Sequence, residues 1–327
     1  MIQMIREDIS SPAQSTQTST HVNAEGGLDR QIDWMRIIPF ILLHLSCLAV
    51  FFVGFSWFAV AVMIAFYLLR MFAITAFYHR YFSHKAFKTS RTVQFIFALI
   101  GVMSTQNGPL WWAAHHRNHH RYADKAGDLH SPRDGFWYSH MGWFLNKQNY
   151  ATQEHLVKDW IRFPELKWLD RYSVLVSVLT AVSFWIVGSV LEHTVPSLGT
   201  NGLQLLVWGF LISTVLLTHV TLTINSFAHR FGFRTYLTQD DSRNNWFLAI
   251  ITLGEGWHNN HHFCPASVRQ GFVWWQIDLS FYVLKVMSYL GLVWDLVPIP
   301  PKAFRAQSIQ SIAAQSTSQT SPTDSIK

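Results

Sequence analysis

The chain has 327 residues, of which 50% are hydrophobic and only 13% are charged, whereas charged residues make up about 25% of an average soluble protein. This composition excludes two ordinary soluble domains and favours a single body embedded in a membrane. The net charge of +6 fits attraction to anionic lipid, so no nucleic-acid partner is expected.

Both ends of the chain are polar. Residues 1–30 and 305–327 are rich in Ser, Thr and Gln, which predicts disordered tails. The first tail has no contiguous apolar core, so it is not predicted to be a secretory signal. We therefore expect one domain, at residues 31–304.

Long uncharged runs predict four membrane-spanning helices. The run 37–69 contains no charged residue; it is too long for one span of about 20 residues and fits two spans joined by a turn at 54–57. Two further uncharged runs cover 172–191 and 202–228. The predicted spans are 37–53, 58–77, 172–191 and 203–224.

The distribution of basic residues predicts the orientation. Neither of the two expected outer loops, 54–57 and 192–201, contains any of the 25 Lys and Arg residues. By the positive-inside rule, the tails and the segment between the second and third spans face the cytoplasm. All the histidine motifs described below fall on that same side of a multi-pass membrane protein.

The remaining segments predict a helical cap on the cytoplasmic side. Residues 93–112 are uncharged but interrupted by Gly108-Pro109, which favours a helix lying in the interface rather than a span. Residues 122–170 are polar and rich in aromatic residues, as expected of a cap, and 273–296 is predicted to be an amphipathic interfacial helix. The predicted fold class is an all-α integral membrane protein with four spans and a cytosolic helical cap that holds the histidine site described next.

Nine histidines, in three close motifs and one single position, carry the chemistry. The motifs are His-Arg-Tyr-Phe-Ser-His at 79–84, His-Arg-Asn-His-His at 116–120 and His-Asn-Asn-His-His at 258–262, and the single histidine is His229, four residues after Asn225. Because helix positions i, i+3 and i+4 share one face, each of the last two motifs is expected to present three imidazoles to one point. The first pair, five residues apart, is expected to converge where a helix end loosens.

This donor set predicts a transition-metal site. Imidazole suits Zn, Cu, Fe and Ni, and structural zinc would normally recruit Cys and close at four ligands. Nine ligands exceed what one ion uses and fit two ions with four or five each, which makes a di-iron centre the best match. A solvated surface patch explains one motif alone, but not three motifs on one face of a membrane.

Other polar residues near the motifs have two interpretations. His130 or His140 either fixes the tautomer of a ligand or has no such role, and Glu255 and Asp124 either orient ligand imidazoles or are simple surface carboxylates. Three isolated histidines in or beside the apolar helices are interpreted as satisfied polar groups: His44, His193 and His219.

At these motifs the chain closely resembles the membrane fatty acyl desaturases of the stearoyl-CoA Δ9 type. The matching segments are 79–84, 112–120, 139–143, 225–229 and 254–262, in the family's order, and 269–278 resembles the bacterial branch. The resemblance implies two irons, with Asn225 reaching one of them through water and the nine histidines as ligands: His79, His84, His116, His119, His120, His229, His258, His261 and His262.

The resemblance also implies a reaction and its partners. An O2-dependent enzyme of unsaturated fatty acid biosynthesis would introduce a cis double bond, at Δ9, into a saturated long-chain acyl group. Ala113, Ala114 and His115 replace charged residues of the animal acyl-CoA members, and Lys147 stands alone where they have adjacent basic residues. These departures leave fewer basic contacts for the phosphates of CoA. The expected acyl carrier is still CoA, with a membrane glycerolipid as the alternative. The chain lacks the His-Pro-Gly-Gly of a fused cytochrome b5, so an external ferredoxin-, rubredoxin- or cytochrome b5-like donor and a reductase are expected.

A narrow apolar tunnel should position the acyl chain, because its C–H bonds offer no acidic proton for side-chain catalysis. Tyr67 lies twelve residues before His79, about 18 Å along a helix at 1.5 Å per residue, and Met63 lies one turn further. We hypothesise that one of these two closes the tunnel; ordinary packing is the alternative, and Ala variants with unchanged product lengths would exclude the hypothesis. The other candidate substrate residues are Gln106, Asn107, Trp112 and Lys147.

Two rival functions use the same residues. A histidine-motif hydroxylase of alkanes, sterols or carotenoids would use the same oxidant. A metal transporter or sensor would need ionisable groups across the membrane midplane, where the predicted spans hold only two histidines, His44 and His219, besides Arg70.

Overall fold

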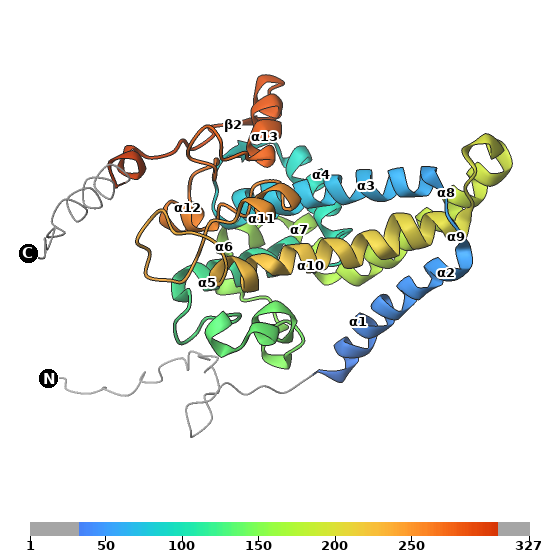
Figure 1. Ribbon diagram of the computed structural model, residues 1–327, viewed down its shortest axis with the longest axis horizontal. Coiled ribbons are helices and arrows are strands. Elements are labelled where there is room, and N and C mark those ends of the chain that lie inside the picture. The colour runs from blue at the N-terminus through green and yellow to red at the C-terminus, as the bar shows by residue number, and fades with distance from the viewer. Residues whose placement is uncertain (1–32, 307–327) are drawn as a thin grey trace, which may run out of the picture.

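The computed structural model describes residues 33–306, and the regular structure of this part of the chain is mainly helical (Figure 1). One short antiparallel pair joins β1 (Lys88–Thr89) to β2 (Val293–Trp294). The all-α prediction is therefore confirmed. The predicted disordered tails fall almost wholly outside the described residues.

Four helices are long and apolar enough to cross a membrane, at Trp34–Val53, Trp57–Ser83, Ser173–Thr194 and Gly202–His229. The second and fourth extend beyond the predicted ends, so each carries a histidine of the motifs at its terminus. The elements that form them are α1 (Trp34–Ser46), η1 (Cys47–Ala49), α2 (Val50–Val53), α3 (Trp57–Phe72), η2 (Ala73–Ser83), α8 (Ser173–Thr194), α9 (Gly202–Gln204), η8 (Leu205–Ile212), α10 (Ser213–Ser226) and η9 (Phe227–His229).

Local sequence explains where these helices break and meet. Gly54 has a φ of 71°, which a residue with a side chain rarely adopts, and Ser56 then caps α3 through the amide of Ala59 at 3.3 Å. The predicted turn at 54–57 therefore lies where expected. At the other hairpin, a Cβ on Gly188 would lie 2.6 Å from the carbonyl oxygen of Asn201, so only glycine lets α8 approach α9 this closely.

Arg70 is a fully buried cation in the middle of the second long helix. It donates to the hydroxyls of Ser213 and Thr214 on α10, at 2.6 and 2.8 Å, and to the carbonyl of Met103 at 3.0 Å. A buried charge is tolerated only when its donors are satisfied. These bonds tie the second and fourth long helices together below the cap.

η7 (Pro196–Leu198) joins α8 to α9 at one end of the bundle, and the remaining elements form the cap over the other end (Figure 1). Its larger members are α4 (Arg91–Val102), α5 (Pro109–Tyr122), α7 (Pro164–Arg171), α11 (Trp246–Ile251), α12 (His258–Phe263) and α13 (Leu279–Tyr289). The short ones are η3 (Pro132–Asp134), η4 (Tyr138–Gly142), η5 (Lys147–Asn149), η6 (Glu154–Leu156) and α6 (Lys158–Ile161).

Two predicted cap helices were too long. The segment 93–112 is not one helix, because Thr105 and Asn107 have positive φ angles and Pro109 starts a new helix at its first position. The segment 273–296 is helical only at α13, which Asp278 caps through the amide of Phe281 at 3.0 Å. Gly291, with a φ of 71°, then turns the chain toward β2.

Candidate metal centre

A π-helix brings the first two histidines together. His79 lies inside η2 and His84 caps it, and the amide of His84 donates to the carbonyl of His79, five residues earlier, at 3.3 Å. This i→i+5 bond places both side chains on one face, with ring centroids 5.0 Å apart. The predicted loosening of the helix end is therefore a π-helical segment.

The other two motifs lie on α5 and α12, but each divides its imidazoles between two sites. The expectation that three imidazoles of one motif meet at one point was wrong. Successive residues are about 100° apart around a helix of 3.6 residues per turn, so adjacent histidines such as His119 and His120 diverge. The ligand atoms form a five-histidine cluster (His79, His84, His116, His120 and His261) and a four-histidine cluster (His119, His229, His258 and His262).

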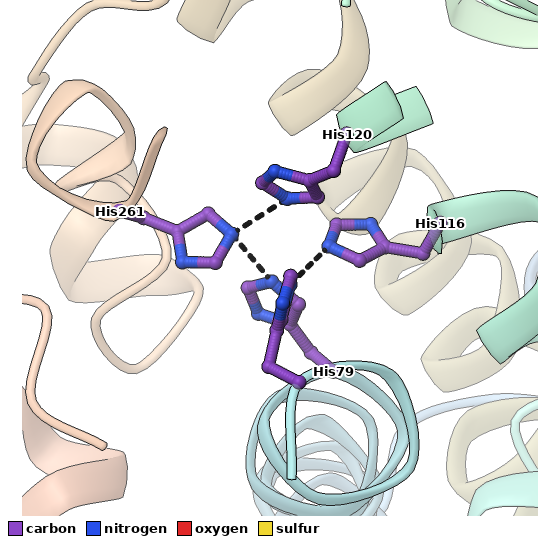
Figure 2. Close-up of side chains that lie close together, drawn as sticks. His79, His116, His120 and His261 are labelled. Carbon is purple, nitrogen blue, oxygen red and sulfur yellow. Dashed lines mark hydrogen bonds between the residues drawn. The ribbon is translucent and has the colours of Figure 1, made fainter. Parts of the chain in front are cut away.

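Within the five-histidine cluster, rings from η2, α5 and α12 point at one another (Figure 2). The Nε2 atom of His261 lies 3.0 Å from Nε2 of His79 and 2.9 Å from Nε2 of His120. Nε2 of His84 and Nε2 of His116 are 2.8 Å apart. The same ring atom of every histidine thus converges on a small volume.

In the four-histidine cluster, three rings contact a carboxylate through Nδ1. Nδ1 of His229 donates to Asp124 at 2.8 Å, and Nε2 of the same ring lies 3.0 Å from Nε2 of His258. Two more rings are held in the same way, His119 by Asp128 and His262 by Asp240, each at 3.0 Å. In the five-histidine cluster, one ring has such a partner: His79 contacts Glu255.

A carboxylate on Nδ1 fixes the tautomer. With the proton held on Nδ1, the Nε2 lone pair is free to bind a metal, as in carboxylate–histidine–metal triads. Nε2 of His262 is buried and has no hydrogen-bond partner among residues 33–306, which fits a ligand atom. The proposed orienting roles of Asp124 and Glu255 agree with this geometry.

The sequence reading missed Asp128 and Asp240. Asp128 follows the second motif by only eight residues, which was a usable signal, whereas Asp240 is remote in sequence from every histidine motif. Of the two candidate supporting histidines, His130 stacks on His119 with centroids 4.3 Å apart. His140 instead bonds Ser226 and His219, each at 3.0 Å.

Burial keeps most rings of both clusters neutral. Burial, followed by repulsion from neighbouring imidazoles, holds the pKa well below its ordinary value for His84, His116, His120, His258 and His261. These rings are neutral at pH 7, the form that binds metal.

His119 of the four-histidine cluster behaves differently. Burial alone would lower its pKa, but the charge and hydrogen bond of Asp128, with help from Asp124 and Asp240, raise it above the ordinary value. The surrounding negative charge that favours a proton here also favours a metal cation. The imidazoles of both clusters are either neutral or hydrogen-bonded to a carboxylate. Both clusters therefore fit transition-metal ions.

Two cavities adjoin the clusters and share lining residues, among them Trp112, His116 and Asn225. A small one of about 40 Å³ is lined by rings of both clusters, including His79, His119 and His258, and by Trp112 and Asn225. Its size suits a molecule as small as water. Asn225, expected beside the metals, therefore faces the space between the clusters.

The larger cavity, of about 570 Å³, holds Gln106, Asn107 and Trp112 in its lining and reaches His116 and Asn225. Its walls are mainly apolar, as expected for an acyl chain. Tyr67, Met63 and Lys147 do not line it. The hydroxyl of Tyr67 donates to the carbonyl of Ile251 at 2.7 Å, and Lys147 is exposed on η5.

Comparison with known proteins places this site in a family. The sequence model of the family described as fatty acid desaturase matches residues 31–291. The chain is 36% identical over 290 residues to the acyl-CoA 5-desaturase AL21 of Anemone leveillei, covering 84% of this chain and 85% of that one.

Two relatives act on lipid-linked chains by their names. The chain is 36% identical to the delta-9 acyl-lipid desaturase 1 of Arabidopsis thaliana, over 84% of this chain and 87% of the relative. It is 33% identical to the sn-2 palmitoyl-lipid 9-desaturase of Nostoc sp. (strain 36), over 85% and 95%. The chain therefore belongs to the fatty acid desaturase family and is an oxidoreductase.

Proposed function

We propose that this protein is a di-iron, O2-dependent desaturase that introduces a cis double bond, at Δ9, into a saturated long-chain acyl group. The observation that supports it most is the pair of buried imidazole clusters at the end of an apolar cavity. The overall change removes two hydrogens from neighbouring methylenes. Dioxygen accepts these hydrogens with two electrons and two protons, and leaves as two waters.

The proposed ligands of one iron are the five-histidine cluster, and those of the other are the four-histidine cluster, with Asn225 acting through water. Bound iron would supply the oxidant that can break an unactivated C–H bond, for which side-chain acids and bases are too weak. Asp124, Asp128, Asp240 and Glu255 keep the protons on Nδ1 of their histidines and so fix the ring orientations.

The larger cavity would bind and position the acyl chain. Trp112 lines both cavities and stacks on His116 with centroids 5.1 Å apart. It therefore limits how a methylene pair can approach the small cavity between the clusters. Gln106 bonds Thr221 at 3.1 Å, and both side chains belong to the same wall. These contacts would set which C–C bond reaches the irons.

We also propose a membrane location and an electron donor for the protein. Four apolar helices would cross a bacterial inner membrane, with the cap and the histidine clusters on the cytoplasmic side. Electrons would come from a separate ferredoxin-, rubredoxin- or cytochrome b5-like protein with its reductase. The relatives act on acyl-CoA or on acyl-lipid according to their names, and either carrier is compatible with desaturation.

Fatty-acid profiling in a host that lacks desaturase activity tests the function. Expression of this chain should produce monounsaturated acids two mass units lighter than their saturated precursors, with double bonds at Δ9. A His116→Ala variant should give no such product. Products heavier by one oxygen would instead show a hydroxylase and contradict the proposal.

A further inference from the structure

The larger cavity is lined on two sides by α1 and α8, which belong to two of the helices suited to cross a membrane. Its lining runs from Met35 to Leu43 on α1 and from Ser173 to Ala181 on α8, about 12 Å along each helix at 1.5 Å per residue. In Figure 1, α1 diverges from α10 toward its own N-terminus. The cavity that reaches His116 is therefore walled, at its far end, by a helix set apart from the bundle.

Several lining residues also face outward. Met35 is 85% exposed, Val174 is 72% exposed and Val178 is 53% exposed, although all three line the cavity. Residues around a closed cavity would be buried. All three side chains are apolar and lie in the helices that are suited to cross a membrane, so the surroundings of this opening would be lipid.

α1 is held by few contacts. None of its residues is buried, and it packs mainly on η8. Nε2 of His44 lies 2.8 Å from Nε2 of His219 on α10, and the amide of Asp33 donates to the carbonyl of Leu145 at 3.0 Å. Arg36 also stacks on the ring of Tyr150, and Phe40 packs against Phe144. A helix held by these few contacts can separate from α8 without disturbing the histidine clusters.

The charge of the lining argues against a CoA carrier inside the opening. A CoA thioester carries several phosphate groups, which proteins bind with clustered Arg and Lys. Among residues 33–306, Arg36 is the one Arg or Lys in the lining. It already pairs with Asp33 at 3.4 Å and stacks on the ring of Tyr150.

We infer that the acyl substrate enters sideways from the bilayer, between α1 and α8, while still attached to a membrane glycerolipid. The headgroup would stay at the membrane surface near Arg36 and Tyr150, and the chain would reach His116 without leaving apolar surroundings. This inference rests on the proposed desaturase function and specifies its substrate class.

Reconstitution with defined substrates tests the carrier. Iron-loaded protein in liposomes, supplied with an electron donor and reductase, should desaturate distearoylphosphatidylcholine in preference to stearoyl-CoA. Conversion of stearoyl-CoA with the lipid left intact would overturn this inference and leave the desaturase function standing. Conversion of neither would contradict both.

A bulky residue at the opening tests the route. Val178→Trp should raise KM for the lipid about tenfold, the effect of about 1.4 kcal/mol of lost binding. Val187→Trp is the matched control, because Val187 is on the same helix and 50% exposed but outside the cavity lining; it should behave like the unmodified protein. Equal effects of the two variants would contradict lateral entry.

Photocrosslinking gives a readout that needs no activity. A phosphatidylcholine with a diazirine in the middle of one acyl chain should label the peptides that contain Leu43 and Val178. Unlabelled phosphatidylcholine should suppress the labelling, and stearoyl-CoA should not. Suppression by stearoyl-CoA at lower concentration would overturn the inference.

Discussion

The two histidine clusters are built from the same motifs but are stabilised differently. In the four-histidine cluster, three of the four rings donate to a buried carboxylate: Asp124, Asp128 and Asp240. In the five-histidine cluster, only His79 has such a partner, in Glu255. The other rings of that cluster are fixed by the helices that carry them and by packing against one another.

This difference separates two ways of preparing an imidazole for a metal. A carboxylate holds the proton on Nδ1 and adds negative charge near the ion. Burial without a carboxylate keeps the ring neutral by lowering its pKa. We expect the four-histidine cluster to depend on remote acidic residues, and the five-histidine cluster on the geometry of η2, α5 and α12.

The largest expected effect comes from removing one imidazole of each cluster. His119→Ala and His116→Ala change residues three positions apart on α5, yet each should lower the bound iron by about half, from different clusters. Each should also reduce turnover by at least about 100-fold, because ligand geometry determines the chemistry of a metal site.

Metal analysis and Mössbauer spectroscopy of the purified variants measure this. His155→Ala is the control, because His155 is exposed on η6 and should leave iron unchanged. If both variants lost the same iron, the division of α5 between two clusters would be contradicted.

Carboxylate removal should have the next largest effect. Asp240→Asn removes the negative charge behind Nδ1 of His262 and should weaken iron binding by about 10- to 100-fold, the usual effect of losing such a carboxylate partner. Asp241→Asn is a matched control, because Asp241 pairs at the surface with Arg133 at 2.8 Å. Chelator competition measures both, and equal losses would show that the effect is not specific to the triad.

Lowering the pH should release iron from the four-histidine cluster first. The pKa of His119 is raised above its ordinary value, whereas burial lowers the pKa of His84 and His261 well below theirs. Between pH 7 and 5 a proton therefore competes with the metal at His119 but not at the other two. Affinity should fall by up to about tenfold per pH unit for one displaced proton.

Iron release followed by spectroscopy across this pH range checks the order. Asp128→Asn, which removes the main cause of the raised pKa, should make the release less steep with pH. Simultaneous loss from both clusters would contradict the comparison.

The smallest expected effect concerns the substrate cavity. Trp112→Leu should change the proportion of double-bond positions by about threefold, corresponding to about 0.65 kcal/mol, because Trp112 lines both cavities and contacts His116. Lys147→Gln should leave the products unchanged, since Lys147 does not line the cavity. Mass spectrometry of the products measures both variants, and equal product distributions in the two would contradict the role of Trp112.

Local patterns made much of this architecture predictable. Uncharged runs located the four long helices, since a run of such length has few other uses. The close spacing of the histidines identified the metal-binding residues as a group, because repeated imidazoles on one helix face are rarely accidental. Both signals lie within short stretches of chain.

What the sequence did not reveal depends on contacts between remote segments. Asp240 meets His262 only because the chain folds back between η9 and α11, so its spacing carries no signal. Helix geometry shows that the imidazoles of one motif diverge. Assigning each imidazole to one of the two clusters requires the positions of the other helices. The hydroxyl of Tyr67 bonds Ile251 of α11, a contact between remote segments that its distance from His79 could not reveal. That Tyr67 or Met63 closes the tunnel stays a prediction.

Anomalous diffraction at the iron absorption edge tests the central claim most directly. Crystals of the iron-loaded protein should show two anomalous peaks. One should lie among His79, His84, His116, His120 and His261, and the other among His119, His229, His258 and His262. A single peak shared by both clusters, or a signal at the zinc edge alone, would contradict the account.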